Sequence, residues 1–176
     1  MQMKEALDVA ESIIMNDSLL YQHCINVATI SYYAAKKLGL DQEKAFVGGL
    51  LHDMGKLGYV KITMANGPSA VAFMDHPVIG YGMLKDVDEE AAIMAYTHHL
   101  YQGTKYPDKV EIEIPKELEP YCQLIAYVDK IEAFMTRSHY SAHRARDTVD
   151  RFYPFIPGIS QAVYDVVSNY SVVRLT

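Results

Sequence analysis

Residues 17–39, DSLLYQHCINVATISYYAAKKLG, carry the pattern that decides the fold class. Asp17 and Ser18 are good N-cap residues, because their side-chain oxygens can accept hydrogen bonds from the first free backbone N–H groups of a helix. Gly39 is a typical helix stop. Between these signals, apolar residues recur every three or four positions, as on the inner face of an amphipathic helix. The inner face reads Leu20, His23, Val27, Ile30, Ala34 and Leu38. We therefore predict a helix that runs to Leu38.

Helical patterns also dominate the rest of the chain, and strand patterns are weak throughout. Further helices are predicted over about 2–15, from Asp41 through Asp53, from Pro77 to near Val87, from Asp88 through His99, over 115–136, near 141–152 and near 158–170. Residues 56–70, with a turn at 66–68, and residues 100–114 are predicted loops. Gly48 and Gly49 lower helix propensity within a predicted helix, which indicates a close approach of a second helix. The expected fold is all-α, a single-domain helical bundle over residues 1–176.

The composition is that of a globular domain. The chain has 176 residues, of which 50% are hydrophobic and 22% charged, and this length suits one domain. Sixteen basic and twenty-two acidic residues give a net charge of −6, which argues against stable nucleic-acid binding. No apolar run is long enough to span a membrane. Cys24 and Cys122 form no CxxC pair, so we expect a reducing, cytoplasmic location.

A series of histidines and aspartates falls on, or at the ends of, the predicted helices. The series is His23, His52, Asp53, His76, His98, His99 and Asp129. In a helical bundle, side chains on facing helices can converge on one metal site. Imidazole and carboxylate groups suit iron, manganese, zinc or cobalt. Asp53 is the natural bridging candidate, because one carboxylate can bind two cations. A buried Asp129 must be paired or bound to a cation.

Each member of this series also has an ordinary structural explanation. A histidine on an apolar helix face is usually a hydrogen-bonded core residue, and the helix dipole favours an imidazolium at a helix C-terminus. Asp129 could pair with Lys130. One metal site explains all members together, whereas the ordinary explanations require an independent coincidence for each. We therefore prefer the metal site.

Two other groups of residues are interpreted as structural. His139 and His143 are spaced one helical turn apart and could bind zinc, but we interpret them as part of a solvated face near Arg144 and Arg146. The face of the last predicted helix is interpreted as core, with a homodimer contact as the alternative. This face consists of Val163, Tyr164, Val167 and Tyr170.

The series resembles the HD superfamily of metal-dependent phosphohydrolases over about residues 19–140. The matching segments are His23, GLLHDMGK at 49–56, DHPVIGYGML at 75–84, His98-His99 and Asp129. HHLYQGTKYP at 98–107 resembles, in degenerate form, the HHE…GxGYP segment of the HD-GYP branch. Leu100 and Lys105 depart from that segment, and Ser138-His139-Tyr140-Ser141 stands where the branch has Arg-Pro-Tyr-Arg. In that branch these positions belong to substrate recognition, so the departures do not affect the candidate metal ligands.

The resemblance implies an all-helical domain with two divalent metal ions, on which the helices at 141–170 pack. The first ion would be held by His23, His52, Asp53 and Asp129, and the second by Asp53, His76, His98 and, as ligand or neighbour, His99. Leu19 stands where some members carry a glutamate for a third metal, so we expect two. Iron or manganese is favoured, with zinc, nickel, cobalt or magnesium as alternatives. Lys56 would face the substrate phosphate, and Gly103, Lys105 and Tyr106 would contribute to substrate binding.

The expected function is hydrolysis of a phosphoester or phosphoanhydride bond in a small nucleotide-like substrate. Two cations bridged by Asp53 would activate a water molecule, Lys56 would offset phosphoryl charge, and His98 or His99 would protonate the leaving group if not a ligand. Three alternatives stay open. VDKIEA at 128–133 resembles a branch that splits dinucleoside polyphosphates, some members of the superfamily are di-iron oxygenases, and the degenerate GYP segment fits a non-catalytic nucleotide-binding module.

Overall fold

The capping residues set the ends of the helices in the computed structural model, which describes residues 1–15, 17–57, 72–101, 106–107, 109–152 and 158–169. The Asp17 side chain accepts a hydrogen bond from the Leu20 N–H at 2.9 Å and begins α2 (Ser18–Leu38). Gly39 ends this helix with φ 69°, a left-handed conformation that favours glycine. Asp41 caps α3 (Gln42–Leu51) and Asp88 caps α6 (Glu89–Thr97) in the same way as Asp17.

The described residues form helices and no strand, which confirms the predicted all-α fold class. The remaining elements are α1 (Met3–Ile14), α5 (His76–Leu84), α7 (Glu119–Thr136), α8 (Ala142–Phe152), α9 (Ile159–Val167) and two short 3-10 turns, η1 (Met54–Lys56) and η2 (Ala72–Asp75). The loop predicted over 56–70 lies almost entirely outside the described residues. Among the described residues, no helix combines the length and the apolar character needed to cross a membrane.

Two helices end earlier than predicted, and a histidine side chain explains both ends. The α3 helix ends at Leu51 rather than continuing through Asp53, and α6 ends at Thr97 rather than at His99. The His52 ring donates from Nδ1 to the Gly49 carbonyl at 2.8 Å, and the His98 ring donates to the Ala95 carbonyl at 2.6 Å. These carbonyls would otherwise accept the next backbone N–H of the helix, so the rings compete with helix continuation.

Other boundaries also differ from the prediction. The long helix α7 begins at Glu119 instead of Pro115, with residues 116–118 in a turn. Pro120 explains this start, because a proline disfavours helical geometry in the preceding residue and fits the first turn of a helix. The α5 helix ends at Leu84, before the predicted Val87, and α9 ends at Val167.

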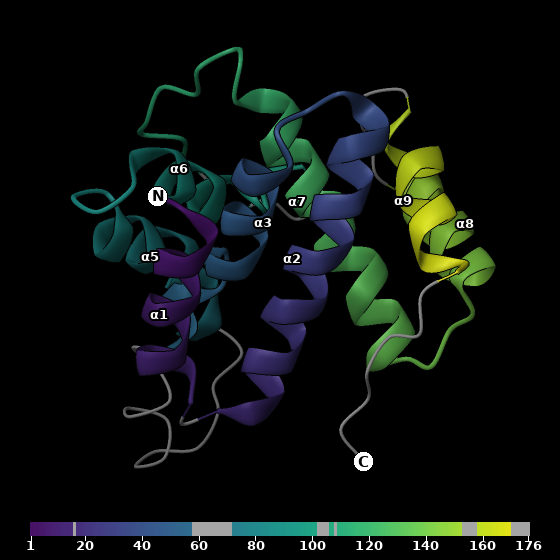
Figure 1. Cartoon of the computed structure of the whole chain (residues 1–176), viewed down its shortest axis with the longest axis horizontal. Helices are drawn as coiled ribbons and strands as arrows, with labels where there is room; N and C mark the ends of the chain where they lie inside the picture. The colour runs from purple at the N-terminus through teal and green to yellow at the C-terminus, as the bar shows by residue number, and fades with distance from the viewer. Residues whose placement is uncertain (16, 58–71, 102–105, 108, 153–157, 170–176) are drawn as a thin grey trace.

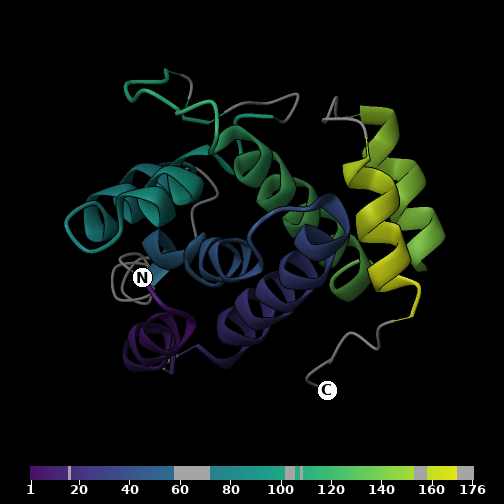
Figure 2. The same cartoon turned by 45° about the horizontal axis from the view of Figure 1, so that its top comes forward.

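The helix α2 lies between α1 and the C-terminal pair α8 and α9 (Figures 1 and 2). Its buried residues contribute to two apolar clusters. One cluster joins α2 and α7 to the C-terminal pair α8 and α9, and includes Ile30, Ile125 and Val163. The other joins α2 to α1, α3 and α6, and includes Leu50 and Leu51. The candidate metal ligands lie where α2, α3, α5, α6 and α7 approach one another, so burial on both sides of α2 helps to fix their positions.

A glycine allows α3 to lie close to α2. A Cβ atom added at Gly49 would lie 2.8 Å from the Ala28 Cα, which belongs to the backbone of α2. At Gly48 an added Cβ would instead meet the flexible end of the Met94 side chain. The close helix approach predicted from these glycines is therefore confirmed, and it brings the C-terminal end of α3 beside His23.

The C-terminal helices pack on the domain through apolar and polar contacts. Val163 and Val167 are buried, which confirms the core prediction for these two residues of the last helix, whereas Tyr164 is half-buried and Tyr170 lies outside the described residues. The Tyr127 hydroxyl of α7 donates to Asp150 of α8 at 2.7 Å. Ser160 of α9 donates to the same carboxylate at 2.6 Å. Asp150 thus links three helices.

Candidate metal centre

The carboxylate of Asp53 lies at the centre of the site, and its two oxygens face different groups of histidines. Asp53 is fully buried in the turn that follows α3. Its Oδ1 lies 3.1 Å from His76 Nε2 and 3.4 Å from His98 Nε2. Its Oδ2 lies 3.5 Å from His52 Nε2 and 3.6 Å from His23 Nε2. This arrangement suits a carboxylate that bridges two cations.

Asp129 approaches the site from α7. Its Oδ1 lies 3.2 Å from His23 Nε2 and 3.8 Å from His52 Nε2. Its Oδ2 forms an ion pair of 3.1 Å with Lys130 Nζ. The pairing with Lys130 that served as the ordinary explanation is therefore present, but Lys130 takes only one of the two oxygens and the other faces the histidines.

The structure brings together all the histidines and aspartates that the sequence singled out as ligands. Within each of two groups, the candidate ligand atoms lie within 4.8 Å of one another. The groups are His23, His52 and Asp129, and Asp53, His76, His98 and His99. All are buried, and they come from α2, the ends of α3 and α6, the start of α5, and α7. Their assignment as metal ligands stays a prediction.

Hydrogen bonds at Nδ1 orient three of the imidazole rings. His52 and His98 donate to the backbone carbonyls that end their helices, and His23 Nδ1 lies 2.5 Å from Glu132 Oε2. A ring that donates from Nδ1 presents the Nε2 lone pair, and this arrangement is typical of histidines that bind metals. His99 differs in the role of its Nδ1. Lys130 Nζ lies 3.4 Å from this nitrogen, and because an ammonium group can only donate, the His99 Nδ1 acts as the hydrogen-bond acceptor.

Several buried polar atoms of the site are suited to coordinate a cation. His23 Nε2, His52 Nε2 and Asp53 Oδ1 form no aligned hydrogen bond with other described residues. Buried polar atoms in this condition are costly, and coordination to a cation removes the cost. The donor set consists of imidazole nitrogens and carboxylate oxygens, which suits a divalent first-row transition metal.

The surroundings hold Asp53 and His52 in the protonation states that bind cations. Burial opposes the ionisation of Asp53, but Lys56 and the nearby histidines keep the pKa of its carboxyl well below the usual range. Burial lowers the pKa of His52 to about 3. Burial also acts to lower the pKa of His23, but the neighbouring carboxylates of Asp129 and Glu132 outweigh it and raise this pKa to about 9. At pH 7 Asp53 is therefore an anion and His52 is neutral, whereas His23 must release a proton when a cation binds at its Nε2.

Glu132 and Asn26 are parts of the site that the sequence reasoning did not identify. Glu132 is 1% exposed and accepts hydrogen bonds from His23 and, at 2.8 Å, from Asn26 Nδ2. Glu132 lies three positions after Asp129, and Asn26 lies three positions after His23, so each pair shares a helix face. That spacing is a signal that could have identified both residues.

Replacing Glu132 with glutamine is expected to weaken metal binding at the His23 group by about 10- to 100-fold, because the ring loses the carboxylate that orients it. Titration against a chelating indicator dye measures this change. Glu117→Gln, at an exposed position, is the matched control and should bind metal like the wild type. Unchanged affinity in Glu132→Gln would show that Glu132 does not position His23.

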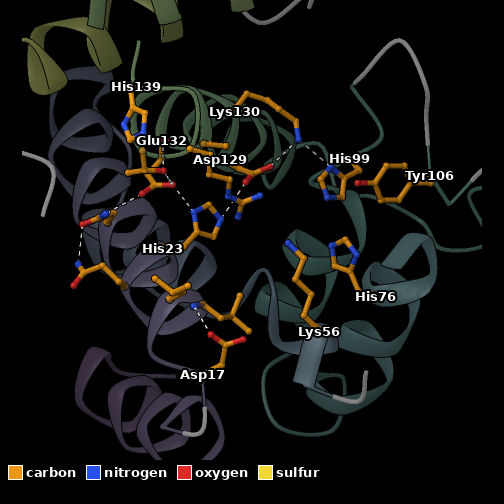
Figure 3. Close-up of a pocket in the computed structure, with 17 residues that line it drawn as sticks. Asp17, His23, Lys56, His76, His99, Tyr106, Asp129, Lys130, Glu132 and His139 are labelled. Carbon is orange, nitrogen blue, oxygen red and sulfur yellow. Dashed lines mark hydrogen bonds and ion pairs between the residues drawn. The ribbon is translucent and has the colours of Figure 1, made fainter. Parts of the chain in front are cut away.

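A pocket of about 740 Å³ opens onto the site (Figure 3). Lys56 lines it and contacts Asp53 Oδ2 through its ammonium group. Tyr106 stacks on the His99 ring with a centroid separation of 4.2 Å. Leu19 also lines the pocket and offers no metal-binding atom. The predicted substrate-binding residues Gly103 and Lys105 lie outside the described part of the chain.

The structure separates the two histidines near the start of α8. His143 is exposed on this helix and lies 3.3 Å from Asp147, which confirms the predicted solvated face. His139 precedes the helix, because α8 begins only at Ala142, and it lines the pocket. His139 is exposed as well, as predicted for a solvated face, but it does not lie on the helical face that carries His143.

Comparisons with known proteins agree with this geometry. The sequence profile described as the HD domain matches residues 20–133. Two similar solved structures are of the HD domain of L. monocytogenes phosphodiesterase PgpH, one of them in complex with cyclic-di-AMP. Each is 18% identical with a TM-score of 0.66. The match with the complex covers 92% of this chain and 93% of the PgpH chain. The match with the other structure covers 90% of this chain and 94% of the PgpH chain. No curated protein sequence matches.

The structural likeness shows a shared fold. The profile match spans more than half of the chain and confirms the resemblance found in the sequence, together with the expected class of metal-dependent hydrolase. The chain belongs to the HD domain family.

Proposed function

We propose that this protein hydrolyses a phosphoester or phosphoanhydride bond in a nucleotide-like substrate at a dinuclear metal site. The observation that carries the proposal is the position of Asp53, whose two oxygens face two separate groups of histidines at 3.1–3.6 Å. The PgpH HD domain, which shares the fold, has been crystallised with cyclic-di-AMP, and this supports a nucleotide-like substrate.

The proposed ligands divide between the two oxygens of Asp53. His23, His52 and Asp129 would hold one cation with Oδ2, and His76 and His98 would hold the other with Oδ1, with His99 as a further ligand or a neighbour. The nitrogen and oxygen donors favour iron or manganese. Two bound divalent cations lower the pKa of water and polarise phosphoryl oxygens.

The remaining roles belong to side chains that line the pocket. Lys56 lines the pocket, and its ammonium group is proposed to bind a phosphate oxygen through a charge-assisted hydrogen bond. Lys130 lies between Asp129 and His99 and adds a second positive charge there. The ring of Tyr106, stacked on His99, gives the pocket a flat aromatic wall that suits a base or sugar.

Replacing Lys56 with alanine is expected to lower kcat by about 100-fold while both metal ions stay bound, because one cation that stabilises phosphoryl charge is lost. Hydrolysis would be measured on cyclic dinucleotides, nucleotides and dinucleoside polyphosphates, beside the metal content of each sample. Lys85→Ala, at an exposed position in the turn after α5, is the control and should keep full activity.

Two results would contradict the proposal. Full activity in Lys56→Ala would remove Lys56 from the mechanism. A wild-type protein that binds two metal ions and hydrolyses none of these substrates would favour the non-catalytic nucleotide-binding module over the hydrolase.

A further inference from the structure

Tyr96 joins the two helices that carry the second group of candidate ligands. It lies in the last turn of α6 and is 4% exposed. Its ring packs edge-on against the Tyr81 ring of α5, with a centroid separation of 5.6 Å and an interplanar angle of 74°. Because α5 begins at His76 and α6 is followed directly by His98 and His99, Tyr96 lies next to the site without lining the pocket itself.

The Tyr96 hydroxyl forms two hydrogen bonds with one stretch of backbone. It donates to the Lys109 carbonyl at 2.9 Å and accepts from the Glu111 N–H at 3.3 Å. Val110, the residue between these two, is exposed. No backbone–backbone hydrogen bond joins residues 109–114 to another part of the chain that the structure describes. The hydroxyl therefore supplies an attachment to α6 that the backbone of this segment does not make by itself.

This attachment lies three residues after Tyr106. Three residues of chain span at most about 11 Å, so a fixed Lys109 confines Tyr106 to a small volume. On the far side of the attachment, Ile112 and Ile114 pack against the apolar cluster that α2 and α7 share. These apolar contacts hold the segment where it leads toward α7, whereas the hydrogen bonds of Tyr96 hold it where it leads away from the pocket.

The Tyr106 ring needs such an attachment to keep its position. It stacks on the His99 ring at a centroid separation of 4.2 Å and an interplanar angle of 30°, and Figure 3 shows the two side chains next to each other. The free energy gained by one aromatic pair is of the same order as the conformational entropy that is lost when one backbone residue is ordered. The stack alone therefore does not hold this segment against the pocket.

A purely structural role does not explain both hydrogen bonds of Tyr96. A buried tyrosine hydroxyl usually needs a partner, and Tyr127 finds one in Asp150 of the neighbouring helix. Tyr96 instead uses its donor and its acceptor on the same segment. Because the two bonded groups lie on either side of Val110, they fix the direction of the segment as well as its distance from α6.

We propose that Tyr96 is a positioning residue, which holds the Tyr106 ring against His99 by anchoring the segment that follows it. The Tyr106 ring thereby forms a fixed wall of the pocket, and its contact with a base or sugar of the substrate rests on the proposed function. That part of the substrate lies away from the reacting phosphate. A wall that is no longer held weakens the ground state and the transition state equally, so KM rises while kcat is unchanged.

The first measurement does not depend on a substrate. The chain contains no tryptophan, so Tyr106→Trp introduces a single fluorescent reporter at the wall of the pocket. Acrylamide quenching and fluorescence anisotropy of this reporter are compared in the full chain with and without Tyr96→Phe. We expect Tyr96→Phe to raise the quenching constant about twofold and to lower the anisotropy, because the segment opens locally. Tyr127→Phe, which removes the hydroxyl that donates to Asp150, is the matched control and should change neither.

Kinetics on the metal-loaded protein measure the effect on the substrate. They use the cyclic dinucleotide, nucleotide or dinucleoside polyphosphate that the wild type hydrolyses fastest. Tyr96→Phe is expected to raise KM by about fivefold and to leave kcat unchanged, as the loss of a neutral hydrogen bond provides. Tyr106→Ala should raise KM by at least as much. Adding Tyr96→Phe to Tyr106→Ala should raise KM no further, because Tyr96 acts through the ring that is already missing.

Three results would contradict the positioning role. They are a reporter that does not respond to Tyr96→Phe, a reporter that responds equally to Tyr127→Phe, and increases in KM that multiply in the double variant. If the reporter responds only to Tyr96→Phe but the wild type hydrolyses none of the substrates, Tyr96 still positions Tyr106 and the proposed function fails.

Discussion

Replacing Asp53 with alanine is expected to remove both metal ions and the hydrolytic activity together. Asp53 faces both groups of histidines, one with each oxygen, so its loss takes a ligand from each cation. We expect kcat/KM to fall by about a thousandfold or more, because the contribution of the cations to catalysis is lost with them. Elemental analysis and hydrolysis assays on the same preparation measure both effects.

Two further variants separate this loss from a folding defect. Asp53→Asn keeps the volume of the side chain and removes its charge, and it should also lose metal. Asp86→Ala removes an exposed carboxylate after α5 and should behave as wild type. Thermal unfolding confirms that each variant is folded. Full metal occupancy in the Asp53→Ala protein would refute the bridging role.

Gly55→Ala is expected to cause the largest loss of stability among single substitutions near the site. An added Cβ would overlap the His76 carbonyl oxygen and would lie 2.6 Å from the Gly80 backbone nitrogen. Both atoms belong to the backbone of α5, so the whole helix must move. We expect a loss of about 3 kcal/mol in the free energy of unfolding, at the upper end for overpacked sites. Because α5 carries His76, metal binding should weaken as well.

Two glycines provide controls for this prediction. At Gly82, within α5, an added Cβ would meet no atom within 4 Å, so Gly82→Ala should leave stability unchanged or raise it by up to about 1 kcal/mol. At Gly48 the neighbouring atoms are the flexible end of Met94, so a smaller loss than at Gly55 is expected. Chemical denaturation measures all three, and equal stability of Gly55→Ala and Gly82→Ala would contradict the argument.

The sequence predicted the helices well wherever the signals were local. Asp17, Asp41 and Gly39 act through backbone groups within a few residues, and each has the predicted role. The ends of α3 and α6 could not be predicted in the same way. They depend on His52 and His98 turning their rings toward their own helix, an orientation in which Nδ1 donates to a backbone carbonyl and Nε2 faces Asp53.

The candidate ligands were predictable for a different reason. Histidine and aspartate are costly to bury, so their repeated placement on apolar helix faces indicated a shared site. Glu132 was not predicted, because its role depends on how α2 and α7 pack against each other. The position of His139 at the wall of the pocket was not predicted, because its left-handed turn forms only after α7 ends and Tyr140 stacks on Phe134.

The metal content of the purified protein, determined by elemental analysis, tests the central claim most directly. Two atoms of a divalent metal per chain, iron or manganese, are predicted for the wild type, and none for Asp53→Ala. A folded wild-type chain that holds no metal after incubation with both ions, or one whose metal content does not depend on Asp53, would contradict the dinuclear site.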